Sequence, residues 1–235
     1  MAIIASIINL FLSPADAFSS LNKLDSGKTR TTLLLILVSL GLINLFLLKD
    51  LYMDVQYEQT IERIENSERI PEEQKAEILQ DMDERFENPS IGQQSIMWLT
   101  NALGFPLRVI FMALIVLLIG NFIMGGNLKY GALVNVTALA YMISILELAV
   151  KIPLMYYKWS IEVYTGLGLL GIGEPGSFIY YFLNGIDIFG AWRLVVLGIG
   201  ASLLYNKKPA GFIGALFVYW IIQITITSSI GAVFS

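Results

Sequence analysis

Residues 31–48 read TTLLLILVSLGLINLFLL, an uncharged run of 18 residues between a basic segment that ends at Arg30 and the charged pair Lys49-Asp50. A helix of this length rises about 27 Å at 1.5 Å per residue. That rise is close to the roughly 30 Å hydrocarbon core of a bilayer. The stretch therefore predicts a helix that spans a membrane.

Four further runs share this character, and the composition of the whole chain agrees with them. Apolar residues make up 56% of the 235 residues and charged residues only 14%, against roughly a quarter charged residues in a soluble domain. The further spans are predicted at 98–124, 130–150, 178–205 and 210–234. We therefore predict an all-α polytopic membrane protein with five membrane-spanning helices.

The residue types that are missing limit the chemistry of this chain. It contains no cysteine and no histidine, which excludes disulfides, thiol nucleophiles, Cys/His metal sites and imidazole acid–base catalysis. The glycine-rich stretch 166–173 lacks the Lys-Ser/Thr pair of a phosphate-binding loop. We therefore expect a protein that is not an enzyme, with no catalytic residues, no cofactor, no metal and no nucleic-acid partner.

The first 30 residues have a pattern of their own. Apolar residues recur at helical spacing from Ile3 to Phe11. Pro14 and Asp16 after a serine are typical of the start of a second helix. Residues 1–30 are predicted to form two amphipathic helices that lie in the cytoplasmic interface. The alternative is a frayed tail.

Residues 31–235 are predicted to form the membrane domain, interrupted by a polar segment at 49–95. Residues 49–87 carry 13 acids and 5 bases, a net charge of −8. Pro71 followed by two glutamates is typical of a helix start. The segment predicts an external helical hairpin whose acids form a solvated face, a docking surface for a basic partner or a loose cation site.

Basic residues near the span ends predict the orientation of the chain, because they are retained on the cytoplasmic side. One side collects them in short loops: Lys23, Lys28, Arg30, Lys129, Lys207 and Lys208. We therefore expect a cytoplasmic N-terminus and, after five crossings, an extracytoplasmic C-terminus.

Four ionisable residues fall within the predicted spans: Arg108, Glu147, Asp187 and Arg193. Arg108 and Asp187 lie roughly 15 Å and 13 Å from the outer ends of their helices, and intramembrane charges usually pair, so we predict an ion pair between them. Glu147 is expected to pair with Lys151 one turn later. Arg193 is expected to hydrogen-bond to Asn121, Asn135 or backbone carbonyls, or to extend toward the inner interface. Such groups either fix helix register or form a polar pathway.

Small residues predict where helices approach closely. Gly198 to Ala201 in the fourth span and Gly211 to Ala215 in the fifth are suited to close helix contact or to a membrane-protein partner. Pro106 is expected to kink the second span near Arg108.

Several of these residues resemble motifs of the Yip domain family (Ypt/Rab-interacting membrane proteins). The run IDIFGAW at 186–192, the following glycine-rich half-span, and the opening SPADAF at 13–18 carry the resemblance, with GGNLKY at 125–130. The family-motif residues are Pro14, Phe18, Asp187, Phe189, Trp192 and Gly198. The similarity covers most of the chain except the acidic hairpin.

The resemblance implies five spans with the N-terminus inside. Eukaryotic members are linked to vesicle trafficking, membrane shaping and Rab binding, whereas the large outer hairpin favours a prokaryotic member in the cytoplasmic membrane. We expect a scaffold or accessory subunit of a membrane transport or trafficking assembly, in contact with lipids and a membrane-protein partner. The alternative is a small transporter or channel for ions or lipids that uses polar groups between the second and fourth spans.

Overall fold

The structure, a computed structural model, describes residues 2–21, 23–67 and 70–234. The elements are α1 (Ala2–Leu12), α2 (Pro14–Leu21), α3 (Ser26–Glu65), α4 (Glu72–Glu87), α5 (Ile91–Leu118), the π-helical η1 (Ile119–Ile123), α6 (Tyr130–Ala140), α7 (Ile143–Lys158), the 3-10 helix η2 (Leu167–Leu170), α8 (Phe178–Gly185), α9 (Ile188–Tyr205) and α10 (Pro209–Val233). Five segments of the described chain are long and apolar enough to cross a membrane: Ser26–Glu65, Ile91–Ile123, Tyr130–Lys158, Ile188–Tyr205 and Pro209–Val233. The all-α fold with five candidate spans is confirmed.

Helix α3 contains the first predicted span but continues far beyond it. It begins where the Asp25 carboxylate accepts a hydrogen bond from the Lys28 backbone N–H at 2.7 Å. Its 40 residues extend about 60 Å, roughly twice the hydrocarbon thickness. The first helix of the predicted hairpin is therefore the second half of α3 and no separate element.

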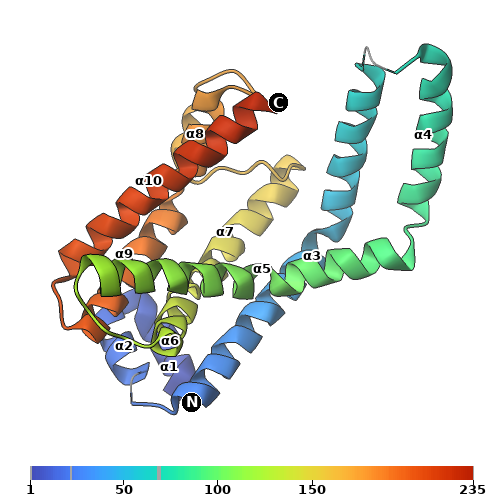
Figure 1. Ribbon diagram of the computed structural model, residues 1–235. Coiled ribbons are helices and arrows are strands. Elements are labelled where there is room, and N and C mark those ends of the chain that lie inside the picture. The colour runs from blue at the N-terminus through green and yellow to red at the C-terminus, as the bar shows by residue number, and fades with distance from the viewer. Residues whose placement is uncertain (1, 22, 68–69, 235) are drawn as a thin grey trace.

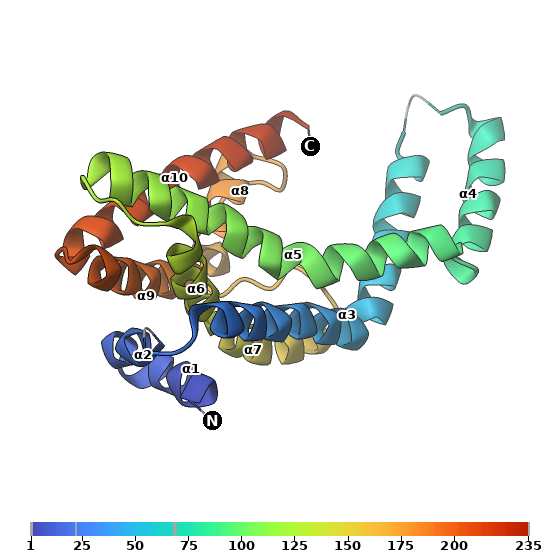
Figure 2. The ribbon, with the colours of Figure 1, turned by 60° about the horizontal axis from the view of Figure 1, so that its bottom comes forward.

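The helical hairpin consists of this second half of α3 and α4, and in both views it stands away from the other helices except α5, whose first turns lie at its base (Figures 1 and 2). The Tyr57 hydroxyl donates to the Asp83 carboxylate at 2.7 Å, and the Tyr57 ring packs edge-on against Phe86. Its buried apolar residues include Leu51 and Ile64 of α3 and Met82 of α4. The hairpin therefore has a small core of its own.

Helix α6 lies at the centre of the remaining helices. Every residue from Leu133 to Ala140 is buried, and α6 contacts α1, α3, α5 and α9. Helices α1 and α2 pack against each other and lie beneath α6 and α9 (Figure 2). Residues 2–21 are therefore helical and attached to the bundle, while their place in a membrane interface stays a prediction.

Two predicted spans are interrupted. The helix predicted at 130–150 is broken at Tyr141–Met142 into α6 and α7, and α7 continues to Lys158. The prediction of one helix over 178–205 is wrong, because α8 ends at Gly185 and α9 begins at Ile188. The fourth candidate span is therefore α9 alone, and α8 belongs to the segment before it.

Helices α9 and α10 show how the small residues are used. A Cβ on Gly198 would lie 2.6 Å from the Ile213 side chain and 3.0 Å from the Ile213 backbone nitrogen, so Gly198 permits the close approach predicted there. Gly214 has nothing within 4 Å of such a Cβ and faces open space. On α10, exposed apolar residues recur every four positions: Val218, Ile222, Ile226 and Ile230. This stripe is suited to face lipid.

Candidate functional site

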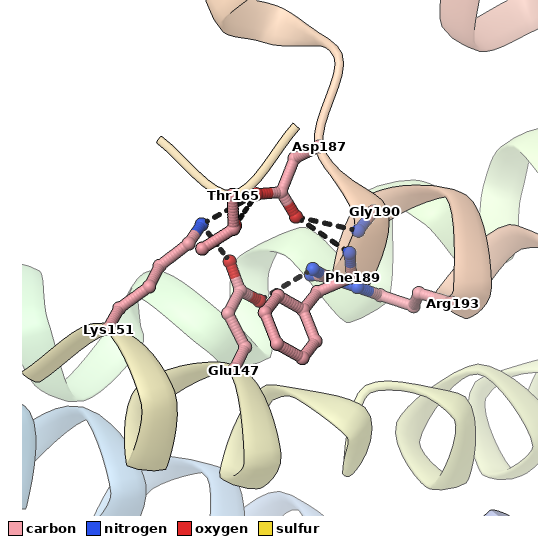
Figure 3. Close-up of polar contacts among 7 residues, drawn as sticks. All are labelled: Glu147, Lys151, Thr165, Asp187, Phe189, Gly190 and Arg193. Atoms are coloured by element: carbon pink, nitrogen blue, oxygen red, sulfur yellow. Dashed lines mark hydrogen bonds and ion pairs between the residues drawn. The ribbon is translucent and has the colours of Figure 1, made fainter. Parts of the chain in front are cut away.

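Four ionisable side chains form a continuous series of ion pairs between α7 and the start of α9 (Figure 3). An Arg193 guanidinium nitrogen lies 2.8 Å from one Glu147 oxygen, and the Lys151 ammonium lies 2.8 Å from the other. Lys151 also lies 3.0 Å from Asp187. Each side chain is only 15–18% exposed. Two acids and two bases make this charge network neutral, which reduces the cost of burying it.

Asp187 connects the charge network to the backbone of α9. One carboxylate oxygen accepts hydrogen bonds from the backbone N–H groups of Phe189 at 2.8 Å and Gly190 at 3.0 Å. The other accepts the Thr165 hydroxyl proton as well as the Lys151 contact. A carboxylate at this position satisfies free N–H groups and favours the positive end of the helix dipole. Asp187 therefore starts α9 and joins it to α7.

Thr165 is brought to this site by a short extended pairing of the connector. The Leu167 N–H donates to the Ile186 carbonyl at 3.0 Å, and the Ile188 N–H donates to the Thr165 carbonyl at 3.3 Å. A Cβ on Gly166 would overlap the Ile186 carbonyl oxygen. Only glycine permits this close approach, so the glycine-rich stretch has a packing role here.

The predicted ion pair between Arg108 and Asp187 is wrong. The depth estimate assumed one continuous helix over 178–205, but the chain breaks at Asp187 and this carboxylate pairs with Lys151. The Arg108 guanidinium instead lies over the Phe105 ring, 5.8 Å from its centroid. Equal distance along two helices does not place two side chains on facing surfaces.

The other predictions for these charges have mixed outcomes. The pair between Glu147 and Lys151 is confirmed, because residues four apart meet on any helix. The expectation for Arg193 is wrong, because its partner is Glu147 on α7. Thr165 was missed by sequence reasoning. Gly185 closely followed by Asp187 is a helix-end and helix-start signal that could have placed the break.

A pocket of about 290 Å³ lies next to the charge network, between α5, α9 and α10. It is lined by Arg108, Phe111, Met112, Tyr141, Gly190, Arg193, Leu194, Tyr219, Trp220 and Gln223. The Arg193 guanidinium lies 4.9 Å from the Tyr141 ring centroid. The Arg193 Nε is buried and has no hydrogen-bond partner among the described residues. We call this space the arginine pocket.

A second polar cluster holds α8 to the connector. The hydroxyls of Tyr164 and Tyr180 lie 2.9 Å apart, and Tyr180 donates to Glu162 at 3.0 Å. Burial raises the pKa of Tyr164 above its usual value, and the Tyr180 hydrogen bond and the Glu162 carboxylate raise it further. Tyr164 is therefore a neutral hydrogen-bonding group. Within the described ranges, no group of three or more acidic side chains is placed to hold a metal ion.

The family-motif residues lie on α9, at its start, or on the helix packed against it: Pro14, Phe18, Asp187, Phe189, Trp192 and Gly198. Pro14 is the first residue of α2, and the fully buried Phe18 ring fills the space above Gly200, where a Cβ would lie 2.6 Å from it. The Trp192 ring meets Phe11 of α1 edge-on at 5.9 Å. Motifs far apart in the sequence thus form one packed unit.

Comparison with known proteins gives one match. A family model described as the Yip1 domain matches residues 8–230. The matched region runs from within α1 almost to the end of α10, so it includes the charge network, the arginine pocket and the hairpin. No curated protein and no solved structure matches the chain.

Proposed function

The chain belongs to the Yip1 domain family, and from this premise we propose that it is a non-enzymatic scaffold or accessory subunit of a membrane transport or trafficking assembly. Its five candidate spans make it an integral, multi-pass membrane protein. The observation that carries the proposal is the hairpin, which extends beyond the bundle that anchors it (Figure 1). A projecting element with few contacts to the rest of its own chain is suited to hold another protein.

A groove at the base of the hairpin supports this role. It has a volume of about 740 Å³ and lies between the hairpin and the first turns of α5. Its apolar residues include three methionines, Met53, Met82 and Met97. Methionine side chains are flexible and adapt to irregular partner surfaces. The groove is therefore suited to an apolar helix face of another protein.

The charge of the hairpin supports a particular chemistry for the proposed partner. Its net charge of −8 over residues 49–87 favours a segment that is basic beside its apolar face. Such charge complementarity mainly increases the association rate and selects between partners. We therefore propose a basic amphipathic helix or loop of a membrane protein as the occupant.

The proposed orientation places the hairpin outside and the N-terminus in the cytoplasm of a prokaryotic cell. Two contacts support a common inner end for four helices. Arg30 of α3 donates to Asn135 of α6 at 3.4 Å, and Tyr205 of α9 donates to Asn121 of η1 at 2.8 Å. This end also carries Lys207 and the other basic loop residues, as retention on the cytoplasmic side requires.

Deletion of the hairpin tests the scaffold proposal. Residues 52–88 are replaced by a short linker, and proteins crosslinked to the tagged chain in native membranes are quantified. A partner should be recovered with the full chain and with an Arg108→Gln control, but not with the deletion variant. Recovery should also fall as salt screens the acidic surface. Equal recovery by the deletion variant contradicts the proposal, and collapse of its helical bundle means that the hairpin is structural.

Transport of ions or lipids is a second candidate, favoured by one observation. The arginine pocket lies between α5, α9 and α10 near the breaks of two spans, and broken helices form substrate sites in transporters. Purified protein in liposomes should then produce substrate-dependent flux without a partner. Flux that an Arg108→Gln variant loses, and the hairpin deletion keeps, would favour transport over the scaffold.

A further inference from the structure

Arg108 presents an exposed cation near the middle of the Ile91–Ile123 span. Within residues 2–21, 23–67 and 70–234, no carboxylate lies at ion-pair distance from it. Its guanidinium lies over the Phe105 ring, 5.8 Å from the ring centroid. A charge within a span is costly unless an opposite charge or water compensates it. The position therefore favours an anion from outside the chain.

The arginine pocket is complementary to an anion. Arg108 of α5 and Arg193 of α9 both line it, and none of its lining residues is acidic. Its other polar side chains are uncharged: Tyr141, Tyr219, Trp220 and Gln223. The buried Nε of Arg193 lacks a hydrogen-bond acceptor among the described residues, although another nitrogen of the same group pairs with Glu147. The pocket thus combines two guanidinium groups with an unmet donor.

The volume of the pocket limits the size of the anion. At about 290 Å³ it equals roughly ten water volumes of about 30 Å³ each. This suffices for a phosphate with a small polar substituent. It does not admit a helix, whose diameter with side chains is about 10 Å. The helix of a partner protein therefore cannot enter the pocket itself.

An apolar groove lies beside the arginine pocket on α5. The groove has a volume of about 540 Å³, and Phe111 lines both spaces. Its lining is almost entirely apolar: Leu107, Ile110, Phe111, Leu114, Leu117 and Tyr130. A cationic pocket beside an apolar groove matches a ligand with an anionic head and a hydrocarbon tail. We call this second space the α5 groove.

Depth along α9 is compatible with a lipid headgroup. Arg193 is five residues after Ile188, which places it about 8 Å from the start of the helix. Arg193 is part of the charge network at that end of the helix (Figure 3). Arginine side chains also extend several ångströms toward an interface. A phosphate that enters from the outer interface is therefore within reach of Arg193, and Arg108 lines the same pocket from α5.

We infer that the arginine pocket binds the phosphate of an anionic phospholipid through Arg108 and Arg193, and that an acyl chain of this lipid lies in the α5 groove. Guanidinium groups bind phosphate oxygens through short, charge-assisted hydrogen bonds. The site shares no residue with the groove at the base of the hairpin. It therefore does not depend on the scaffold proposal.

Lipid binding to delipidated, full-length protein tests the site. Phosphatidylglycerol, phosphatidylcholine and inorganic phosphate are added separately, bound lipid is counted by native mass spectrometry, and thermal unfolding is followed. One phosphatidylglycerol should be retained and should raise the melting temperature, with weaker binding of the zwitterionic lipid. Arg108→Gln should weaken phosphatidylglycerol binding about tenfold or more, as expected for a lost hydrogen bond between charged groups.

Two further variants keep the result interpretable. Leu114→Trp fills the α5 groove while leaving both arginines, and should also weaken lipid binding. Lys158→Gln removes an exposed cation outside the pocket, and should bind like the unmodified chain. Retention by Arg108→Gln at the level of Lys158→Gln overturns the proposal, as does equal binding of the two lipids. Saturation by inorganic phosphate with no lipid retained overturns the lipid assignment.

Discussion

Removal of one charge from the charge network should destabilise the bundle more than the loss of a hydrogen bond. Glu147 is the informative position, because its two oxygens contact Lys151 and Arg193 at 2.8 Å each. Glu147→Gln preserves the shape of the side chain but leaves two cations with Asp187 as the one acid. All four side chains are at most 18% exposed, so solvent screens the excess charge poorly.

The expected loss in the free energy of unfolding follows from the excess positive charge that Glu147→Gln leaves. An uncompensated charge left by breaking a buried ion pair costs about 3–5 kcal/mol. Arg193→Met alone leaves the opposite excess, two acids with Lys151. The double variant removes one charge of each sign and keeps the neutral pair of Lys151 and Asp187. Its loss should therefore be smaller than the sum of the single losses, by about 0.5–3 kcal/mol.

The free energy of unfolding can be measured by titration with sodium dodecyl sulfate in dodecyl maltoside micelles, with helicity as the signal. Glu73→Gln on α4 is the matched control, since its carboxylate is exposed and its loss should stay within about 0.5 kcal/mol. Additive losses in the double variant would refute the coupled network. If Glu147→Gln lowers the free energy of unfolding no more than Glu73→Gln does, the inferred burial of the Glu147 carboxylate would be refuted as well.

Three further predictions concern other parts of the chain. Phe18→Ala should lower the free energy of unfolding by about 3–5 kcal/mol and make the N-terminal helices sensitive to protease; unchanged proteolysis would mean that they do not depend on this contact. Gly166→Ala should separate the connector from Ile186, so that the amide hydrogens of the pairing exchange faster, and unchanged exchange would contradict the required close approach. In this cysteine-free chain, a cysteine at Gln74 should react with an impermeant reagent from outside and one at Lys207 only from inside; the reverse pattern would invert the proposed orientation.

Local pattern was sufficient wherever the determining contacts are local. The five apolar segments were predictable because hydrocarbon thickness sets a length that can be read along the chain. The second helix was predictable from Pro14, whose fixed φ suits the first turn of a helix. The pair between Glu147 and Lys151 was predictable because residues four apart are neighbours on every helix.

Contacts between elements were predicted less well, and the errors share a cause. Counting residues along a helix estimates depth but not the direction in which a side chain points, nor which helix lies beside it. The break in the chain at Asp187 changed both the direction of its carboxylate and the helix that lies beside it. The extension of α7 to Lys158 kept Lys151 inside a helix, where it faces Glu147 and Asp187 together.

Composition and the order of residues along the chain were sufficient to predict an all-α membrane protein with five candidate spans, an acidic hairpin and membership of the Yip1 domain family. The packing of the helices was needed to show which charges meet. It paired Arg193 with Glu147 and Asp187 with Lys151, and it left Arg108 beside a pocket without an acid. The cost of burying each charge depends on the groups that pair with it. Those groups lie on other helices, and the sequence of a single segment does not encode how these helices rotate and pack.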